Sequence, residues 1–180
     1  MTRKKAKGNE FDAFAFHRAM DEERMRRKLG WRQVAQEIWD QSAVLNRIRQ
    51  DHPISPATLT GIGIRGDCTC QHALFILRWL GRSPESFMSP AQVDPGETAL
   101  PAVGADRRLR WDLSALYEAL NTRRCERALS WADLAAELRC TPSQLTGIRK
   151  ARFAIGMRLA MRIVAWLERP AASFVYAAKW

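Results

Sequence analysis

The feature that most constrains this 180-residue chain is an internal repeat. Residues 11–38 align with residues 111–138 without a gap, at a shift of 100 positions. Two later blocks follow in the same order, since residues 59–62 repeat as 145–148 and residues 79–87 repeat as 166–174. Identical pairs in the first block are Asp12/Asp112, Ala15/Ala115, Ala19/Ala119, Arg24/Arg124, Arg27/Arg127, Leu29/Leu129, Trp31/Trp131, Ala35/Ala135 and Glu37/Glu137. Three blocks in one order indicate a duplication, so we expect two copies of one folding unit.

The first copy carries an insertion, because the shift between equivalent residues falls from 100 to 86 along the chain. We place the insertion at 39–54, since this register matches Pro56 with Pro142 and keeps the repeated Leu-Thr-Gly-Ile block. A later insertion would instead pair Leu45 with Leu145 and would lose that block. The inserted segment has apolar residues at helical spacing. It could therefore lengthen the second helix, pack against the other copy or form a dimer surface.

A linker is expected between the copies, at residues 89–108. This segment contains the helix- and strand-breaking residues Pro90, Pro95, Gly96, Pro101 and Gly104. The chain then divides into a basic arm at 1–10, a first domain at 11–88, the linker, and a second domain at 109–180. A flexible linker of this length would let both domains engage one binding site.

The apolar periodicity predicts helices and no strands in either copy. In copy two, Leu113, Leu116 and Leu120 recur at helical spacing, and Thr141-Pro142 is typical of a helix start. The expected helices span 12–28, 31–38, 56–64 and 69–80 in copy one, and 111–127, 131–138, 141–149 and 157–167 in copy two. A short turn closes each copy, at 84–88 and around 173–174. The predicted fold is all-α: two tandem small helical bundles, each containing a helix-turn-helix.

The segment LSWADLAAELRCTPSQLTGIRKAR, at 129–152, resembles the helix-turn-helix of the Cro and lambda-repressor-like (XRE-type) family. The resemblance covers copy two from about 112 to 174, and copy one with its insertion as a departure. It implies that the third helix enters the major groove of DNA. Trp31 and Trp131 stand where the family usually has a polar residue, and we expect both rings to pack into the core rather than on sugar-phosphate. Arg149-Lys150 replaces an acidic residue common in the family, which favours phosphate binding.

Site residues follow from this resemblance position by position in copy two. Those that would face base edges are Ser143, Gln144 and Thr146, of which Gln144 suits a bidentate contact with adenine. Those that would bind phosphates, or in one case a guanine, are Arg149, Lys150 and Arg152. Thr141 and Ser130 would cap helices that point at phosphates.

The equivalent surface of copy one consists of Ser55, Ala57, Thr58, Thr60 and Arg65. These side chains are small and weakly charged. They could contact thymine methyl groups and phosphates, or the copy could be a module kept for packing or partner contacts. The N-terminal Arg3, Lys4 and Lys5 could follow a groove or the phosphates, or form a solubilising tail.

The charge balance favours a polyanionic partner, since 29 basic residues face 19 acidic ones and the net charge is +10. No apolar run is long enough to span a bilayer, and no signal core follows the basic start. Cys68, Cys70 and His72 lack a second ligand pair at zinc-finger spacing, and no nucleophile motif or phosphate-binding glycine loop is present. We therefore expect a cytoplasmic, nucleoid-associated regulator of transcription that binds double-stranded DNA, and not an enzyme. We expect no metal, cofactor or membrane contact, and a homodimer or protein partner is compatible with these features.

A competing hypothesis keeps the fold but changes its use. A protein-interaction module, such as an antitoxin or an anti-activator, would bind a protein instead of DNA. Exposed tryptophans in the insertion or on the fourth helix would favour it, whereas the Arg and Gln side chains of the third helix in copy two favour DNA.

Overall fold

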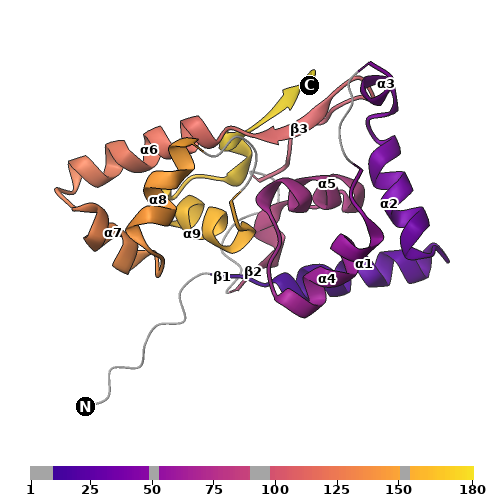
Figure 1. The fold of residues 1–180 in the computed structure, drawn as a ribbon, viewed down its shortest axis with the longest axis horizontal. Helices are drawn as coiled ribbons and strands as arrows, with labels where there is room; N and C mark the ends of the chain where they lie inside the picture. The colour runs from indigo at the N-terminus through magenta and orange to yellow at the C-terminus, as the bar shows by residue number, and fades with distance from the viewer. Residues whose placement is uncertain (1–9, 49–52, 90–97, 151–154) are drawn as a thin grey trace, which may run out of the picture.

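The computed structural model describes residues 10–48, 53–89, 98–150 and 155–180, and its elements repeat along the chain (Figure 1). Copy one runs β1 (Glu10–Phe11), α1 (Ala13–Arg26), α2 (Trp31–Asp40), α3 (Ala43–Asn46), α4 (Pro56–Arg65), α5 (Cys70–Leu80), the 3-10 helix η1 (Pro84–Phe87) and β2 (Met88–Ser89). Copy two runs β3 (Arg108–Trp111), α6 (Leu113–Glu126), α7 (Trp131–Glu137), α8 (Pro142–Gly147), η2 (Ile148–Lys150), α9 (Met157–Leu167), η3 (Ala171–Phe174) and β4 (Val175–Ala178). The mainly helical class is thus confirmed.

The short strands correct the expectation of an all-α chain. Each copy pairs its first residues with its last ones, β1 with β2 and β3 with β4, both antiparallel. The periodicity missed β3 because all four of its residues are buried, including Arg108 and Arg110. The guanidinium of Arg108 lies over the ring of Trp39, and that of Arg110 lies over Phe75. Charged residues that are covered by aromatic rings leave no alternating pattern to detect.

Both ends of the first long helix are held by the same hydrogen bonds in the two copies. Asp12 and Asp112 cap α1 and α6, each accepting a hydrogen bond at 2.8 Å from the backbone three residues on. At the other end, Nη1 of Arg24 donates to the carbonyl of Leu29 at 3.0 Å, and Arg124 makes the equivalent bond at 2.6 Å. These bonds explain why the aspartates and arginines are identical between the copies.

A second pair of equivalent hydrogen bonds joins α2 to α5 in copy one and α7 to α9 in copy two. The indole nitrogen of Trp79 donates to Glu37 at 2.8 Å, and that of Trp166 donates to Glu137 at 2.7 Å. Each carboxylate also pairs with an arginine, Arg27 in copy one and Arg127 in copy two. In copy two the hydrogen bond from Trp166 is the main cause that lowers the pKa of Glu137.

The fourth helix of copy one and the third of copy two occupy equivalent places. Helix α4 packs against α1 and α2, as α8 packs against α7 and η2 packs against α6. Both helices begin with a proline in the first turn, Pro56 and Pro142, behind a capping Ser55 or Thr141. The register with the earlier insertion therefore describes the structure, and α3 lies inside the inserted segment.

The two copies pack directly against each other. The N–H of Cys70 donates to the carbonyl of Ile155 at 2.8 Å, and the N–H of Met157 donates to the carbonyl of Cys68 at 2.7 Å. Helix α5 packs against α9, and one contiguous cluster of buried apolar side chains includes residues of both copies. The copies thus share a core.

The segment between the copies also differs from a free linker over its described part, residues 98–108. Thr98 is fully buried, and Arg78 donates to the carbonyls of Val103, Gly104 and Arg107 at 3.0–3.2 Å. The backbone N–H groups of α3 donate to the carbonyl of Ala105. Carbonyl groups paired in this way hold the segment on copy one, so the inserted helix serves to pack against the connection.

Candidate nucleic-acid interface

A short turn joins α7 to α8 and is fixed by hydrogen bonds to its backbone carbonyls. The turn residue Arg139 adopts a left-handed conformation with φ of 53°. The N–H of Cys140 donates to the carbonyl of Ala135 at 3.0 Å, and Nη1 of Arg162 donates to the carbonyls of Leu138 and Arg139 at 2.6 and 2.8 Å. With the last carbonyls of α7 occupied, the start of α8 has a set direction.

Helix α8 buries one side and presents the other to solvent. Leu145 and Ile148 are buried against the rest of copy two. The exposed residues of α8 and η2 are Pro142, Ser143, Gln144, Thr146, Gly147, Arg149 and Lys150. Every described position that the sequence predicts to face DNA on this segment is therefore on the surface.

Three of these polar side chains are already hydrogen bonded, and one is Ser143, whose hydroxyl lies 3.0 Å from that of Thr141. The amide oxygen of Gln144 accepts a bond from the backbone N–H of Thr141 at 2.9 Å, which closes a capping box. The hydroxyl of Thr146 donates to the carbonyl of Pro142 at 3.2 Å. Gln144 would have to leave its cap to make the expected bidentate contact with adenine, whereas the hydroxyl of the exposed Thr146 is already bonded to the backbone.

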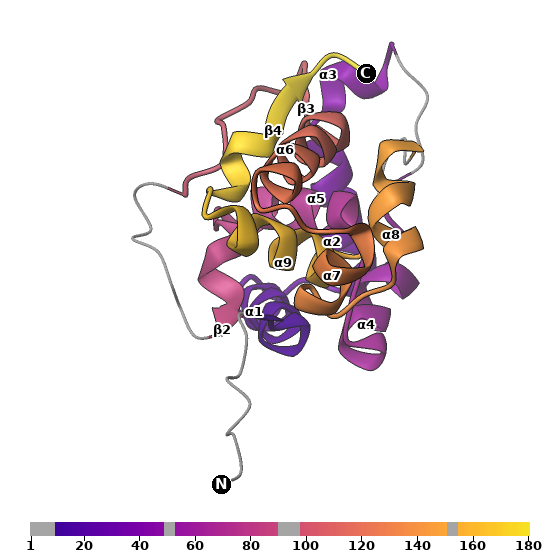
Figure 2. The same cartoon turned by 90° about the vertical axis from the view of Figure 1, so that its left-hand side faces the viewer.

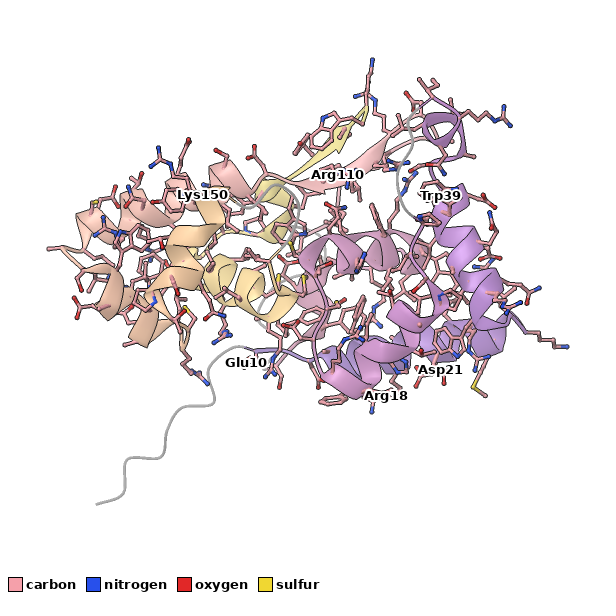
Figure 3. All side chains as sticks on the ribbon, in the orientation of Figure 1. Glu10, Arg18, Asp21, Trp39, Arg110 and Lys150 are labelled. Carbon is pink, nitrogen blue, oxygen red and sulfur yellow. The ribbon has the colours of Figure 1, made fainter. Side chains whose placement is uncertain are left out.

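Arg149 and Lys150 follow directly at the end of the exposed helix. Both are exposed, and within the described part of the chain neither forms an ion pair with an acidic side chain. Figure 3 shows Lys150 at the solvent edge of copy two. Two cations without a protein counterion are available to a ligand anion. Arg152, Arg3, Lys4 and Lys5 lie outside the described residues.

The corresponding surface of copy one is more apolar. Ser55 caps α4 and its hydroxyl lies 2.9 Å from that of Thr58, while the hydroxyl of Thr60 donates to the carbonyl of Pro56. Arg65 folds back along the helix, with its guanidinium 3.4 Å from the carbonyl of Thr58. Ile64 is 84% exposed at the position equivalent to Lys150. Copy one therefore has an apolar side chain where copy two has a positive charge. Ala57 is also exposed on α4.

Helices α4 and α8 lie on the same face of the molecule. They face the viewer in Figure 1, and both lie on the right-hand side after the turn that gives Figure 2. This placement was not predictable from the sequence, because it depends on how the two copies pack.

The two tryptophans at the start of the second helices do not project toward this face as free rings. Trp31 stacks on His17 with centroids 5.7 Å apart, and Trp131 stacks on Tyr117 at the same separation. The guanidinium groups of Arg24 and Arg124 lie over the rings of Trp31 and Trp131. Both tryptophans are half-buried and pack against the core, as expected for a structural role.

The Ser130-x-x-Asp133 spacing predicts a capping box at the start of α7, and the structure has one. The carboxylate of Asp133 accepts bonds from the hydroxyl and N–H of Ser130 at 2.6 and 3.0 Å, and these bonds lower its pKa. The start of α7 therefore carries a negative charge, which disfavours the expected phosphate contact at Ser130. Copy one has the neutral Gln33 here, bonded to the N–H of Gly30 at 2.7 Å.

Cysteine reactivity and metal binding have little support among the described residues. Burial raises the pKa of Cys68 to about 12 and that of Cys70 to about 11, so both thiols are protonated near neutral pH. No group of three or more His, Cys, Asp or Glu side chains lies close enough to hold a metal ion in the described ranges. A cavity of about 720 Å³ lies between α5 and residues 99–103, and none of its described lining residues is on α4 or α8.

No protein-family model, curated protein or solved structure matches the chain. Within the described residues, no helix is both long and apolar enough to cross a membrane. The use of the exposed face therefore has to be inferred from its geometry and charge.

Proposed function

We propose that this protein is a sequence-specific regulator that binds double-stranded DNA in the major groove through α8 and α4. The observation that supports this most is the exposed face of α8, where short polar side chains lead into Arg149 and Lys150. Short polar and methyl-bearing side chains reach base edges, and unpaired cations bind phosphates. The net charge of +10 supports the same partner, because phosphate neutralisation releases counterions.

The test is selection of bound duplexes from a random library by the full chain at near-physiological salt. Wild-type protein should enrich one motif. Arg149→Ala or Lys150→Ala should weaken binding to all sequences and lower the salt slope by about one phosphate contact each. Arg26→Ala is the charge-matched control, since Arg26 lies on α1 and is paired with Glu23. Binding unchanged in both α8-side variants would exclude this surface.

The role of Gln144 can be separated from its cap by Gln144→Glu. A glutamate keeps the oxygen that accepts from the N–H of Thr141, but it has no amide donor for adenine. If Gln144 reads a base, the preferred base at one position of the motif should change, with a discrimination of about 1–3 kcal/mol. An unaltered motif with reduced affinity would assign Gln144 to capping alone.

One observation favours the alternative, a protein-interaction module on the same fold. Ile64 and Phe14 are 84% and 61% exposed in copy one, where copy two has Lys150 and Ser114. Exposed apolar side chains are typical of protein contacts. Salt-sensitive binding to every duplex without an enriched motif would favour this alternative over sequence-specific reading.

A further inference from the structure

The contacts between the two copies join equivalent residues to each other. Cys68 and Ile155 are equivalent at the shift of 87, and so are Cys70 and Met157. The two hydrogen bonds across the interface, Cys70 to Ile155 and Met157 to Cys68, are therefore the same bond made twice in opposite directions. Between them, Thr69 forms an isolated antiparallel bridge with its own equivalent, Gly156.

The packing of whole elements repeats this reciprocity. Helix α5 packs against its equivalent α9, α5 packs against β3, and α9 packs against β1, which is the equivalent of β3. A surface that contacts itself is the mark of a two-fold relation, whereas head-to-tail packing joins two different surfaces. The copies are therefore related by a local two-fold axis that passes between Thr69 and Gly156.

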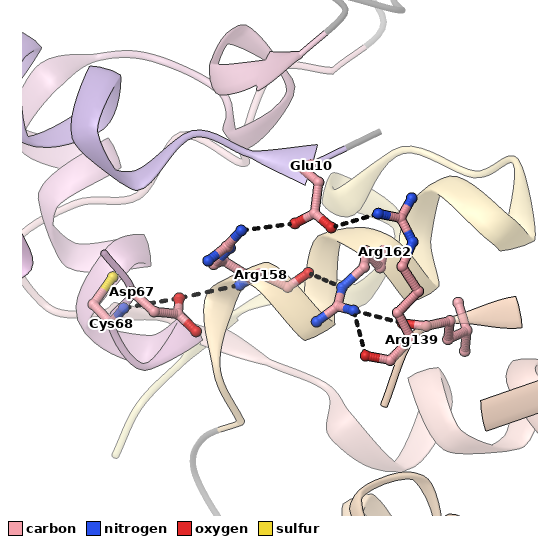
Figure 4. Close-up of polar contacts among 7 residues, drawn as sticks. Glu10, Asp67, Cys68, Arg139, Arg158 and Arg162 are labelled. Atoms are coloured by element: carbon pink, nitrogen blue, oxygen red, sulfur yellow. Dashed lines mark hydrogen bonds and ion pairs between the residues drawn. The ribbon is translucent and has the colours of Figure 1, made fainter. Parts of the chain in front are cut away.

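Polar contacts around this axis fix the relation of the copies (Figure 4). Glu10 of β1 pairs with Arg158 at 3.2 Å and with Arg139 at 3.5 Å, both in copy two. The carboxylate of Asp67 accepts a bond from the N–H of Arg158 at 3.2 Å. Together with the shared core, these bonds hold α4 and α8 in one mutual orientation instead of leaving them on a tether.

We infer that a single chain reads one DNA site whose two half-sites are unlike in sequence and inverted in orientation. This inference rests on the proposed function. Duplex DNA has local two-fold axes perpendicular to its helix, so two reading helices related by a protein two-fold meet half-sites that run in opposite directions. The halves differ because Ala57, Thr58 and Ile64 stand where copy two has Ser143, Gln144 and Lys150.

Orientation can be measured by making the two reading surfaces alike. The triple variant Ala57→Ser/Thr58→Gln/Ile64→Lys gives α4 three exposed side chains of the copy-two segment. It leaves Gly63, the equivalent of Arg149, unchanged because a Cβ there would meet the His17 ring at 2.8 Å. Library selection should then yield an inverted repeat of the copy-two half-site. The control Phe14→Ser also replaces a residue of copy one with its copy-two equivalent, but it lies on α1. It should leave the wild-type motif unchanged.

A direct repeat selected by the triple variant would overturn the inferred orientation while leaving DNA binding intact. A motif with only one half-site would do the same. Failure of the wild-type chain to enrich any motif would instead remove the proposed function. If the triple variant does not fold by circular dichroism, the reverse variant Ser143→Ala/Gln144→Thr/Lys150→Ile provides the same test, with an inverted repeat of the copy-one half-site expected.

Two measurements on wild-type protein test the single rigid reader independently. Sedimentation of the complex with the selected duplex should give one chain per duplex, and two chains would overturn the inference. Insertion of three base pairs between the half-sites should lower affinity on the order of tenfold or more, since the half-site spacing is fixed by the packed copies. Unchanged affinity would show that the copies move independently.

Discussion

The two copies share several internal hydrogen bonds, whereas the exposed side of one helix differs between them. The bonds from Arg24 and Arg124, and those from Trp79 and Trp166, occupy the same places in both halves. On the exposed side of α4 and α8, copy one has Ile64 where copy two has Lys150. This contrast separates what the fold requires, which is retained, from what a partner would contact, which has diverged.

The largest expected effect tests whether the copies are one folding unit. Leu59 and Leu145 are equivalent, fully buried residues of α4 and α8. Leu59→Ala and Leu145→Ala should each lower the free energy of unfolding by about 2–5 kcal/mol. Because the core is shared, each variant should shift a single denaturant transition seen by circular dichroism and by tryptophan fluorescence. Two separate transitions, only one of them shifted, would contradict the shared core.

The next effect belongs to copy one alone. Arg78 donates to the hydroxyl of Ser42 and to four carbonyls, whereas copy two has Ala165 at this position. Arg78→Met should lower the free energy of unfolding by about 2–3 kcal/mol, because several partly buried carbonyls and the Ser42 hydroxyl lose their donor. The nearby exposed Arg82, whose guanidinium covers Phe87, is the control, and Arg82→Met should cost about 0.5–1 kcal/mol. If denaturant unfolding shows the same loss of stability for Arg78→Met and Arg82→Met, the hydrogen bonds of Arg78 contribute no stability.

A smaller effect of opposite sign is expected where the fourth long helix of each copy ends. Gly81 ends α5 with φ of 63°, and Glu168 ends α9 with φ of 54°. Glu168→Gly should raise the free energy of unfolding by about 1 kcal/mol, and Gly81→Ala should lower it by about 1 kcal/mol, because side chains disfavour this conformation.

The control for this pair is Glu168→Ala, which removes the exposed ion pair with Arg123 and keeps the strain. Its stability should stay close to wild type. Stabilisation by alanine equal to that by glycine would attribute the gain to the ion pair and not to the backbone.

The smallest effect is a change in pH dependence at the junction of the copies. Burial raises the pKa of Glu85, whose Oε1 accepts from the N–H of Ala171 and whose Oε2 is buried with no hydrogen-bond partner among the described residues. The folded state therefore binds the proton more tightly than the unfolded state. Stability from this group is present below the ordinary glutamate pKa and is lost as pH rises through the raised pKa. Glu85→Gln should flatten this decline in urea unfolding measured from pH 4 to 7, and an unchanged slope would contradict it.

Local features of the sequence predicted most helices, because each depends on neighbours along the chain. The leucines of α6, the Thr141-Pro142 start of α8 and the exposure of Ser143 and Lys150 all follow from helical spacing and capping. A later insertion would have paired other residues with α8, and the repeated Leu-Thr-Gly-Ile block favoured the register with the earlier insertion.

Features made by distant residues were not predictable in the same way. The pairing of β3 with β4 joins residues more than sixty positions apart, and Arg78 reaches carbonyls of a segment that looked like a free linker. The shared face of α4 and α8 depends on the bridge between Thr69 and Gly156. No local periodicity reports such contacts, because their energy comes from burial against another part of the chain.

The bridge between Thr69 and Gly156 has a consequence for how the two halves change over time. In a pair of identical subunits, every substitution appears on both sides of the axis at once. Here the equivalent positions are encoded separately, so a substitution alters one half and leaves the other as it was. A symmetric pair of identical chains could not have Ile64 in one half and Lys150 at the equivalent position of the other. The same holds for Arg78 and its equivalent, Ala165.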